Sequence, residues 1–376
     1  MKTIGLCMIV KNEARIILRC LASVRPLVDY VLIEDTGSTD ATQAMIRDYL
    51  ARENLPGQVF DEPWRDFAAN RTIALERLRG VPDVDYALII DADDVLVLER
   101  GFDAAAFKAA LMHDLYYVDI RHGAITHRRA QLFSNRVAFR YRGVLHEFPE
   151  GPSGADVSMG DVSGFHIVAG VEGARSDDPD KYRKDADLLA RALADETDPF
   201  LRARYTFYLA QSRRDAGAAE AALATYLERA ELGFWEEEVF ISLYTAGQLM
   251  ERLGYPDTTI VGTFLKAWEA CPRRAESLHG AARYCRVSAK YRQGYMFAKH
   301  ALTIPPPPSG LFLTPWIYDY GLLDELAVNA YWAVQYRDSL AACERLLDEN
   351  KFPAAMRERI EMNARFARDK LAGNAG

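Results

Sequence analysis

The sequence predicts two domains, an α/β domain over residues 1–172 and an all-α domain of helical repeats over residues 173–376. Three observations predict this fold class. Short apolar runs alternate with amphipathic segments in the first half, strand signals stop near Lys181, and helix-turn-helix pairs then recur. A chain of 376 residues is also too long for one ordinary hydrophobic core.

The first domain begins with apolar runs that predict strands and with segments of helical spacing that predict helices. The expected strands here are 4–10, 30–33, 58–60 and 86–90, and the expected helices are 13–24, 40–52 and 66–79. Ser38 or Thr39 is expected to cap the second helix. This order predicts a largely parallel sheet covered by helices, in which ligands bind beyond the carboxyl ends of the strands. Four more strands are expected at 116–120, 129–133, 137–141 and 165–168.

The second domain shows pairs of helical segments separated by short turns. The expected pairs are 204–216 with 218–232, 240–253 with 258–270, 275–290 with 294–302, and 324–335 with 339–348. The turns recur about every 40 residues, near the period of tetratricopeptide and related repeats. Stacked pairs of this kind form a solenoid with a concave surface. The four prolines at 305–308 predict a stiff connector.

Charge and cysteine content narrow the class of function. The formal net charge is -8, which argues against nucleic acid as the main partner. The cysteine count of five is odd and contains no CxxC spacing, so isolated thiols in a reducing cytoplasm are expected. The apolar run at 4–10 is too short for a signal peptide, and no stretch reaches the length of a membrane span. These features are compatible with a cytoplasmic protein that binds the inner membrane peripherally.

Three carboxylates follow directly after the buried strand 86–90, namely Asp91, Asp93 and Asp94. Leaving such charges buried and unpaired is costly, and a divalent cation would remove that cost. Oxygen ligands suit Mg²⁺ or Mn²⁺ bridged to substrate phosphates. The alternative is an ordinary turn in which an aspartate caps the next element.

A second polar segment, 34–40, follows the strand 30–33. A carboxylate at Asp35 can accept a hydrogen bond from a nucleobase N–H or a ribose hydroxyl, and Gly37 lets the backbone approach a ligand. The alternative is a capped turn that enters a helix. That alternative accounts for Ser38 and Thr39 better than for Asp35.

Four sequence blocks together resemble family 2 glycosyltransferases of the GT-A fold. They are LCMIVKNE at 6–13, DTGSTD at 35–40, FAANR at 67–71 and DADD at 91–94. The resemblance is close over 6–94 and looser as far as His166. The helical half resembles the tetratricopeptide regions that are fused to one subgroup of this family.

The resemblance implies a role for each matched position in the nucleotide-sugar pocket. Val10 and Glu13 would line the base and ribose pocket, Asp35 would contact the base, and Arg71 would reach the ribose or a phosphate. For Arg71 the alternative is a helix-surface arginine.

The same resemblance implies that Asp91 and Ala92 face the ribose or sugar and that Asp93 binds the metal, Mn²⁺ or Mg²⁺. The bound metal would stabilise the leaving diphosphate.

The segment 143–147 resembles a G-x-x-H-E block of the family. It implies that Glu147 is the catalytic base, with Asp94 as the other candidate, and that His146 binds metal, phosphate or acceptor. His166 stands where some relatives place a histidine near the diphosphate, but the following residues, 167–170, depart from the family pattern. Ordinary structural roles for Glu147, His146 and His166 are the alternative.

Three functions are compatible with these features. The favoured one is a metal-dependent inverting glycosyltransferase that uses a nucleoside-diphosphate sugar, with UDP favoured, and a polypeptide or cell-surface glycan as acceptor. The second is a catalytically inactive scaffold that binds a protein through its repeats. The third, a nucleotidyltransferase, needs a Gly-rich signature loop after the first strand, and the sequence reads VKNE there.

Overall fold

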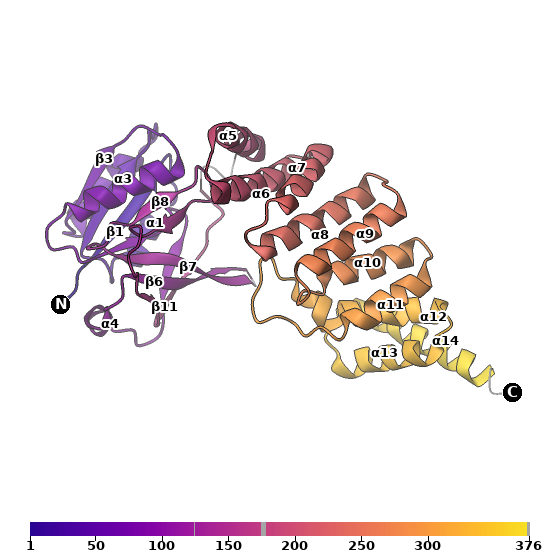
Figure 1. The fold of residues 1–376 in the computed structure, drawn as a ribbon. Coiled ribbons are helices and arrows are strands. Elements are labelled where there is room, and N and C mark those ends of the chain that lie inside the picture. Colours follow the sequence, from indigo (N-terminus) through magenta and orange to yellow (C-terminus); the bar gives the residue numbers. More distant parts are fainter. Residues whose placement is uncertain (124, 174–177, 374–376) are drawn as a thin grey trace. The chain divides into compact units, whose positions relative to one another are not determined.

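The computed structural model describes residues 1–123, 125–173 and 178–373, and it divides into two compact units, residues 1–192 and 193–376 (Figure 1). The sequence had placed the domain boundary after residue 172. Each unit has hydrophobic clusters of its own. The first is a mixed α/β domain and the second is all-α, so the predicted fold class is confirmed.

A single mixed sheet organises the first unit. Its strands and helices are β1 (Ile4–Val10), α1 (Ile17–Val24), β2 (Tyr30–Asp35), α2 (Thr42–Arg52), β3 (Gly57–Asp61), α3 (Phe67–Arg79), β4 (Tyr86–Ile89), β5 (Val95–Leu98), α4 (Ala104–Ala110), β6 (Leu115–His122), β7 (Ile125–Ser134), β10 (Met159–Asp161) and β11 (Phe165–Val168). The strand order is β3-β2-β1-β4-β7-β6-β11-β5, with β10 beside β6. Strands β3, β2, β1 and β4 run parallel, which confirms the predicted parallel core.

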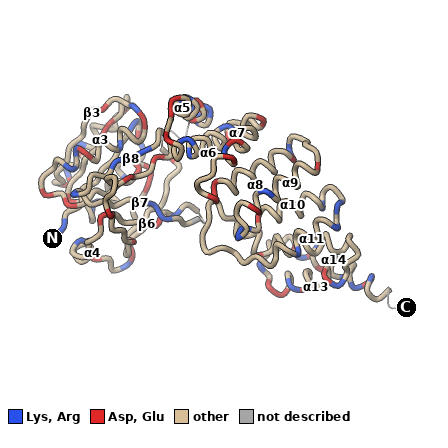
Figure 2. The backbone as a smooth tube through the Cα atoms, viewed as in Figure 1, with Lys and Arg blue, Asp and Glu red and all other residues tan. Residues whose placement is uncertain are grey.

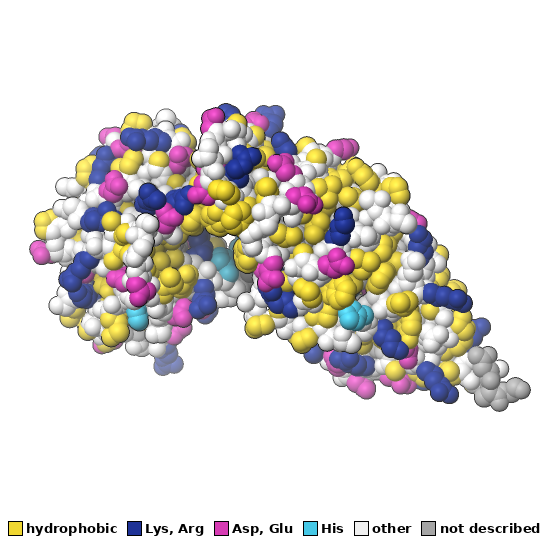
Figure 3. All heavy atoms as spheres, viewed as in Figure 1, with side chains coloured by type: hydrophobic (Ala, Val, Ile, Leu, Met, Phe, Trp, Pro, Cys, Tyr) yellow, Lys and Arg dark blue, Asp and Glu magenta, His cyan; other side chains and the backbone are white. Residues whose placement is uncertain are grey.

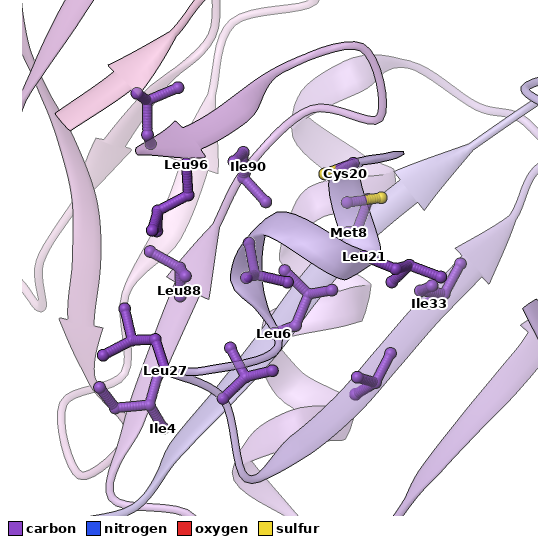
Figure 4. Close-up of a cluster of buried hydrophobic side chains, with 14 of the residues drawn as sticks. Ile4, Leu6, Met8, Cys20, Leu21, Leu27, Ile33, Leu88, Ile90 and Leu96 are labelled. Atoms are coloured by element: carbon purple, nitrogen blue, oxygen red, sulfur yellow. The ribbon is translucent and has the colours of Figure 1, made fainter. Parts of the chain in front are cut away.

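Helices α1 and α3 cover the sheet through alternate strand residues. Leu6 and Met8 of β1 belong to one buried cluster with Cys20 and Leu21 of α1, as Figure 4 shows. Cys7, between them in sequence, belongs to the second cluster, to which α3 contributes. Successive side chains of a strand point to opposite faces of the sheet, so the position of a residue in the strand determines which helix it packs against.

The first residues of α3 and α2 show one helix that its N-cap side chain caps and one that its N-cap side chain does not cap. Asp66 caps α3, because its carboxylate accepts a hydrogen bond from Ala69 N at 2.7 Å. The predicted cap of α2 by Ser38 or Thr39 is wrong, since α2 has no side-chain cap on its N-cap residue. The hydroxyl of Ser38 instead accepts a hydrogen bond from Asn12 N at 2.8 Å, which joins the loop after β1 to the loop after β2.

Some of the remaining elements differ from the predicted ones in their bounds, and others were not predicted. A two-stranded sheet pairs β8 (Arg140–Arg142) with β9 (Phe148–Glu150), and residues 137–139 are not a strand. The short strands β5, β9 and β10 were not predicted, and neither were α4 and the last helix of the chain, residues 357–373. The helix α5 (Lys181–Asp195) follows β11.

The second unit consists of antiparallel helix pairs, as predicted. They are α6 (Pro199–Asp215) with α7 (Ala219–Glu231), α8 (Glu236–Arg252) with α9 (Asp257–Ala270), α10 (Glu276–Val287) with α11 (Tyr291–Ala301), and α12 (Leu322–Trp332) with α13 (Tyr336–Glu349), followed by α14 (Arg357–Gly373). Successive pairs also contact one another, so each pair covers the apolar face of the next.

A buried charged network attaches the proline-containing connector to this unit. Arg274, 1% exposed, donates hydrogen bonds to Glu276, to Glu237 and to the carbonyl oxygen of Leu311, the last at 3.1 Å. Tyr318 donates to the second oxygen of Glu276 at 2.6 Å. Every charge in the network has a partner, which is the condition under which buried ions are tolerated.

The pH dependence of this unit is expected to follow His279 on α10. Burial, reinforced by Arg283 and Arg286, lowers the pKa of His279 to about 4 from 6.5. The unfolded chain therefore binds the proton more tightly, and the free energy of unfolding should decrease as the pH falls from 6.5 to 4, by about 3 kcal/mol in total. Urea unfolding followed between these pH values measures the loss.

His279→Gln should remove most of this dependence. His300→Gln, at an exposed position on α11, is the matched control and should leave it in place. An unchanged pH dependence in His279→Gln would contradict the assignment.

Candidate functional site

The candidate site lies at the carboxyl ends of β1, β2 and β4, as the sequence predicted. Val10 of β1 pairs with Asp35 of β2 in the parallel register, and Cys7 pairs with Ile89 of β4. The residues that follow these strands therefore meet at one edge of the sheet. Figure 2 marks the positions of aspartate and glutamate along the backbone in red.

Asp35 is held rigidly at this edge. It is 1% exposed, and its Oδ1 accepts hydrogen bonds from Gly37 N at 2.9 Å and Ser38 N at 2.6 Å. Gly37 has a φ of 105°, which an L side chain rarely adopts, so the tight turn requires glycine. The second oxygen, Oδ2, is buried and has no hydrogen-bond partner among the described residues. A buried carboxylate oxygen left in this state calls for a donor from a ligand.

Val10 and Glu13 belong to the same edge. The carbonyl oxygen of Val10 accepts hydrogen bonds from Thr36 N at 2.9 Å and from Thr36 Oγ1 at 3.1 Å. The backbone N–H of Glu13 donates to Thr42 Oγ1 at 2.8 Å. The structure thus brings Val10, Glu13 and Asp35 together.

Arg71 joins two of the predicted residues. It is 7% exposed on α3, its Nη2 lies 2.5 Å from Asp91 Oδ1, and its Nε lies 2.7 Å from Glu147 Oε1. Burial opposes the charge on the guanidinium, but Asp91 and Glu147 outweigh burial and raise the pKa of Arg71. Burial likewise opposes ionisation of Asp91, yet Arg71 and then Arg129 hold the pKa of Asp91 below its ordinary value. Arg71 is therefore no surface arginine.

The segment after β11 contacts residues 91–94, which form the loop between β4 and β5 and are called the aspartate loop below. Gly170 N donates to Asp94 Oδ1 at 3.0 Å, and Gly173 N donates to Asp93 Oδ2 at 3.3 Å. A Cβ at Gly170 would stand 2.1 Å from the carbonyl oxygen of Asp93, so only glycine fits here. Arg19 of α1 donates to the same carbonyl at 3.0 Å. Arg19 and Gly170 were not predicted as site residues, since nothing near them in sequence indicates that they contact the carbonyl group of Asp93.

Asp94 differs from the other two aspartates of the loop. It is 4% exposed, and its Oδ2 is buried without a partner among the described residues. Burial first, and then the charge of Asp91, raises the pKa of Asp94 to about 7. Its other oxygen accepts the hydrogen bond from Gly170 N, which connects Asp94 to the segment after β11. Ala92, 6% exposed, packs into the core beneath the loop.

The two histidines lie in different surroundings. His146 is exposed in the loop between β8 and β9, with a φ of 54°, one residue before Glu147. His166 stands opposite Val97 in the pairing of β11 with β5. Burial and then Arg121 lower the pKa of His166, and the carboxylates that act on it are Glu99 and Asp119. His166 thus lies on the strand that pairs with β5, and its role as a metal ligand stays a prediction.

These residues fit a cation that is shared with a substrate. Within 1–123, 125–173 and 178–373, no group of three or more His, Cys, Asp or Glu side chains is arranged to hold a metal by itself. Asp91 already forms an ion pair with Arg71. The side chain of Asp93 is half-buried and accepts one long hydrogen bond, from Gly173 N. Mg²⁺ and similar ions are held in this way, by one or two carboxylates, water and substrate phosphates.

The first unit matches a known family of enzymes. Residues 6–123 match the model of glycosyl transferase family 2. The chain is 31% identical to an uncharacterized glycosyltransferase of Rickettsia felis, over 35% of this chain and 43% of that protein. It is 32% identical to the lipopolysaccharide core biosynthesis glycosyltransferase LpsC of Rhizobium meliloti, over 23% of this chain and 29% of that protein.

Other similarities are partial or remote. A TPR repeat-containing protein of Synechococcus elongatus is 33% identical over 39% of this chain and 35% of its own length. The solved structure of S. aureus TarS aligns with 72% of this chain at 15% identity and a TM-score of 0.35, too low to support a conclusion. The chain thus spans less than half the length of each of these curated relatives. Residues 6–123 belong to glycosyl transferase family 2, and a region of helical repeats follows in the second unit.

Proposed function

We propose that the chain is a metal-dependent inverting glycosyltransferase that uses a nucleoside-diphosphate sugar, with UDP as the favoured nucleotide. The observation that carries this proposal is the buried, unpartnered Oδ2 of Asp35. A nucleobase N–H, such as the imide of uracil, supplies the donor that this oxygen lacks. The backbone around Val10 and Glu13 would form the rest of the base and ribose pocket.

Asp93 is the residue that would hold Mn²⁺ or Mg²⁺, with the donor phosphates and water completing the coordination. When bound, the ion supplies positive charge that stabilises the leaving diphosphate. Arg71 holds Asp91 in its ionised form and in a fixed orientation, so that this carboxylate can accept a hydroxyl of the ribose or the sugar.

Glu147 is proposed as the catalytic base, because Arg71 orients one of its oxygens and its side chain is not fully buried. It would take the proton from the acceptor hydroxyl as that oxygen attacks the anomeric carbon. The bond between this carbon and the diphosphate oxygen breaks at the same time. The products are the glycosylated acceptor and the nucleoside diphosphate.

The acceptor is proposed to be a polypeptide or a cell-surface glycan that the helical unit helps to bind. This unit carries exposed aromatic side chains, among them Trp235, Phe312 and Trp332, which are 48%, 58% and 58% exposed. Figure 3 shows hydrophobic side chains gathered over this unit. The five cysteines are all free and buried, which fits the proposed cytoplasmic location. Among the described residues no helix is long and apolar enough to cross a bilayer.

Calorimetric titration with UDP and GDP, each with and without Mn²⁺, tests the proposal. One nucleotide is expected to bind in a Mn²⁺-dependent manner. Asp35→Ala and Asp93→Ala should each weaken that binding by about ten-fold or more, because each removes a charged partner of the ligand.

The matched control is Asp61→Ala, which changes an exposed aspartate at the end of the neighbouring strand β3 and should leave binding unchanged. Absence of binding with every nucleotide would contradict the proposal and favour a scaffold that binds a protein through its repeats.

A further inference from the structure

Strands β6 and β7 form a ribbon that continues past the aspartate loop. Only Leu132, Phe133 and Ser134 of β7 pair with β4, although β7 begins at Ile125. The first part of β7 therefore runs beyond the end of β4, where Asp91 follows. Figure 1 shows β6 and β7 side by side in this ribbon.

One face of the ribbon presents N–H donors close to the site. Arg129 pairs with Val118 and His127 pairs with Ile120, so these side chains and His122 share a face by the alternation of strands. Arg129 lies 3.9 Å from Asp91 Oδ2 and is 42% exposed. His127 and His122 are exposed farther along the ribbon. Figure 2 shows Lys and Arg in blue along β7.

The opposite face of the ribbon is balanced in charge. Arg128 forms an ion pair with Asp161 of β10 at 2.7 Å and stands opposite Asp119 of β6. On the first face the described positions 118, 120, 122, 127 and 129 carry no aspartate or glutamate. The charged groups that act on His127 are Arg129 and His122, both of them basic. Asp91, at the base of the ribbon, is the carboxylate that Arg129 contacts.

We propose that Arg129, His127 and His122 bind a phosphate or carboxylate group of a glycan acceptor. This inference rests on the proposed glycosyltransferase function and adds the chemical class of its acceptor. The planar guanidinium of Arg129 matches two oxygens of such a group, and imidazole N–H groups donate single hydrogen bonds.

The position of Arg129 favours a sugar over a peptide as the carrier of the charge. The acceptor hydroxyl has to reach Glu147, which Arg71 connects to Asp91, and Arg129 lies beside that same Asp91. The anionic group is therefore bound near the reacting hydroxyl. A sugar that carries both groups on one ring or on adjacent rings meets this requirement.

The protein of residues 1–376 is titrated with glucose, glucose 6-phosphate, glucuronate and a tetraglutamate peptide, both with saturating UDP and Mn²⁺ and without them. We expect glucose 6-phosphate or glucuronate to bind about ten-fold more tightly than glucose, and the preferred probe identifies phosphate or carboxylate as the group. The double variant His122→Gln/His127→Gln should lower that preference about five-fold or more, and Arg129→Gln should lower it further.

Arg128→Gln, on the opposite face of the same strand, is the matched control and should leave the preference unchanged. Equal binding of glucose and both anionic sugars, tighter binding of tetraglutamate, or a preference that the histidine and Arg129 variants do not alter would each overturn the inference. Failure of UDP to bind would contradict the proposed function alone, because the preference among the sugars is also measured without nucleotide.

Discussion

Replacing Glu147 with glutamine is expected to slow sugar transfer by about 10²–10⁴-fold while nucleotide affinity is unchanged. The amide oxygen of glutamine still accepts the hydrogen bond from Arg71 Nε, so the geometry of the site is retained. What is lost is the carboxylate that takes the proton. Single-turnover rates with the donor that calorimetry identifies, compared with nucleotide affinity, separate these two effects.

Glu150→Gln provides the matched control for this experiment. Glu150 is another carboxylate close in sequence and paired with arginines, Arg140 and Arg142, on the hairpin of β8 and β9. Its replacement should leave the rate of transfer within a small factor. If Glu147→Gln turned over normally while Asp94→Asn did not, Asp94 would be the base, and its buried position would have to open during the reaction.

Replacing Arg274 with methionine is expected to lower the free energy of unfolding of the helical unit by about 3–5 kcal/mol. The substitution leaves the carboxylate of Glu276 buried without its cation, and it removes one of the two arginines that contact Glu237. It also releases the carbonyl oxygen of Leu311. Urea unfolding followed by tryptophan fluorescence reports on this unit, because four of the five tryptophans, all except Trp64, lie in it.

Arg273→Met is the control next in sequence. Arg273 is 48% exposed and also contacts Glu237, but exposed ion pairs contribute about 1 kcal/mol or less. The triple variant Arg274→Met/Glu237→Gln/Glu276→Gln should recover part of the loss, because no uncompensated charge remains buried. Equal stability of Arg274→Met and Arg273→Met would contradict this account of the network.

The sequence predicted those parts of the molecule that depend on local pattern. The strands ending near Val10 and Asp35 follow from residue type and spacing, and the helix pairs follow from apolar period and turn residues. The short strands β5 and β10 were missed because three or four residues carry little periodic signal.

Contacts between distant segments account for the remaining differences. Ser38 was expected to cap a helix, but its hydroxyl accepts from Asn12, which belongs to the loop after β1. The hydrogen bond of Arg19 to the carbonyl of Asp93, and the approach of Gly170 to the same carbonyl, join parts of the chain that only the folded sheet brings together. Single-sequence patterns contain no signal for such contacts.

Each unit contains buried cysteines whose reaction with a thiol reagent reports when that unit opens. Cys7 and Cys20 lie in the first unit, and Cys271, Cys285 and Cys343 lie in the second. Burial raises the pKa of the thiols of Cys271 and Cys285 to about 11, so the reactive thiolate is scarce as well as inaccessible. A thiol reagent therefore modifies a cysteine only when its surroundings open. Mass spectrometry of the labelled peptides then records which of the two units opened first.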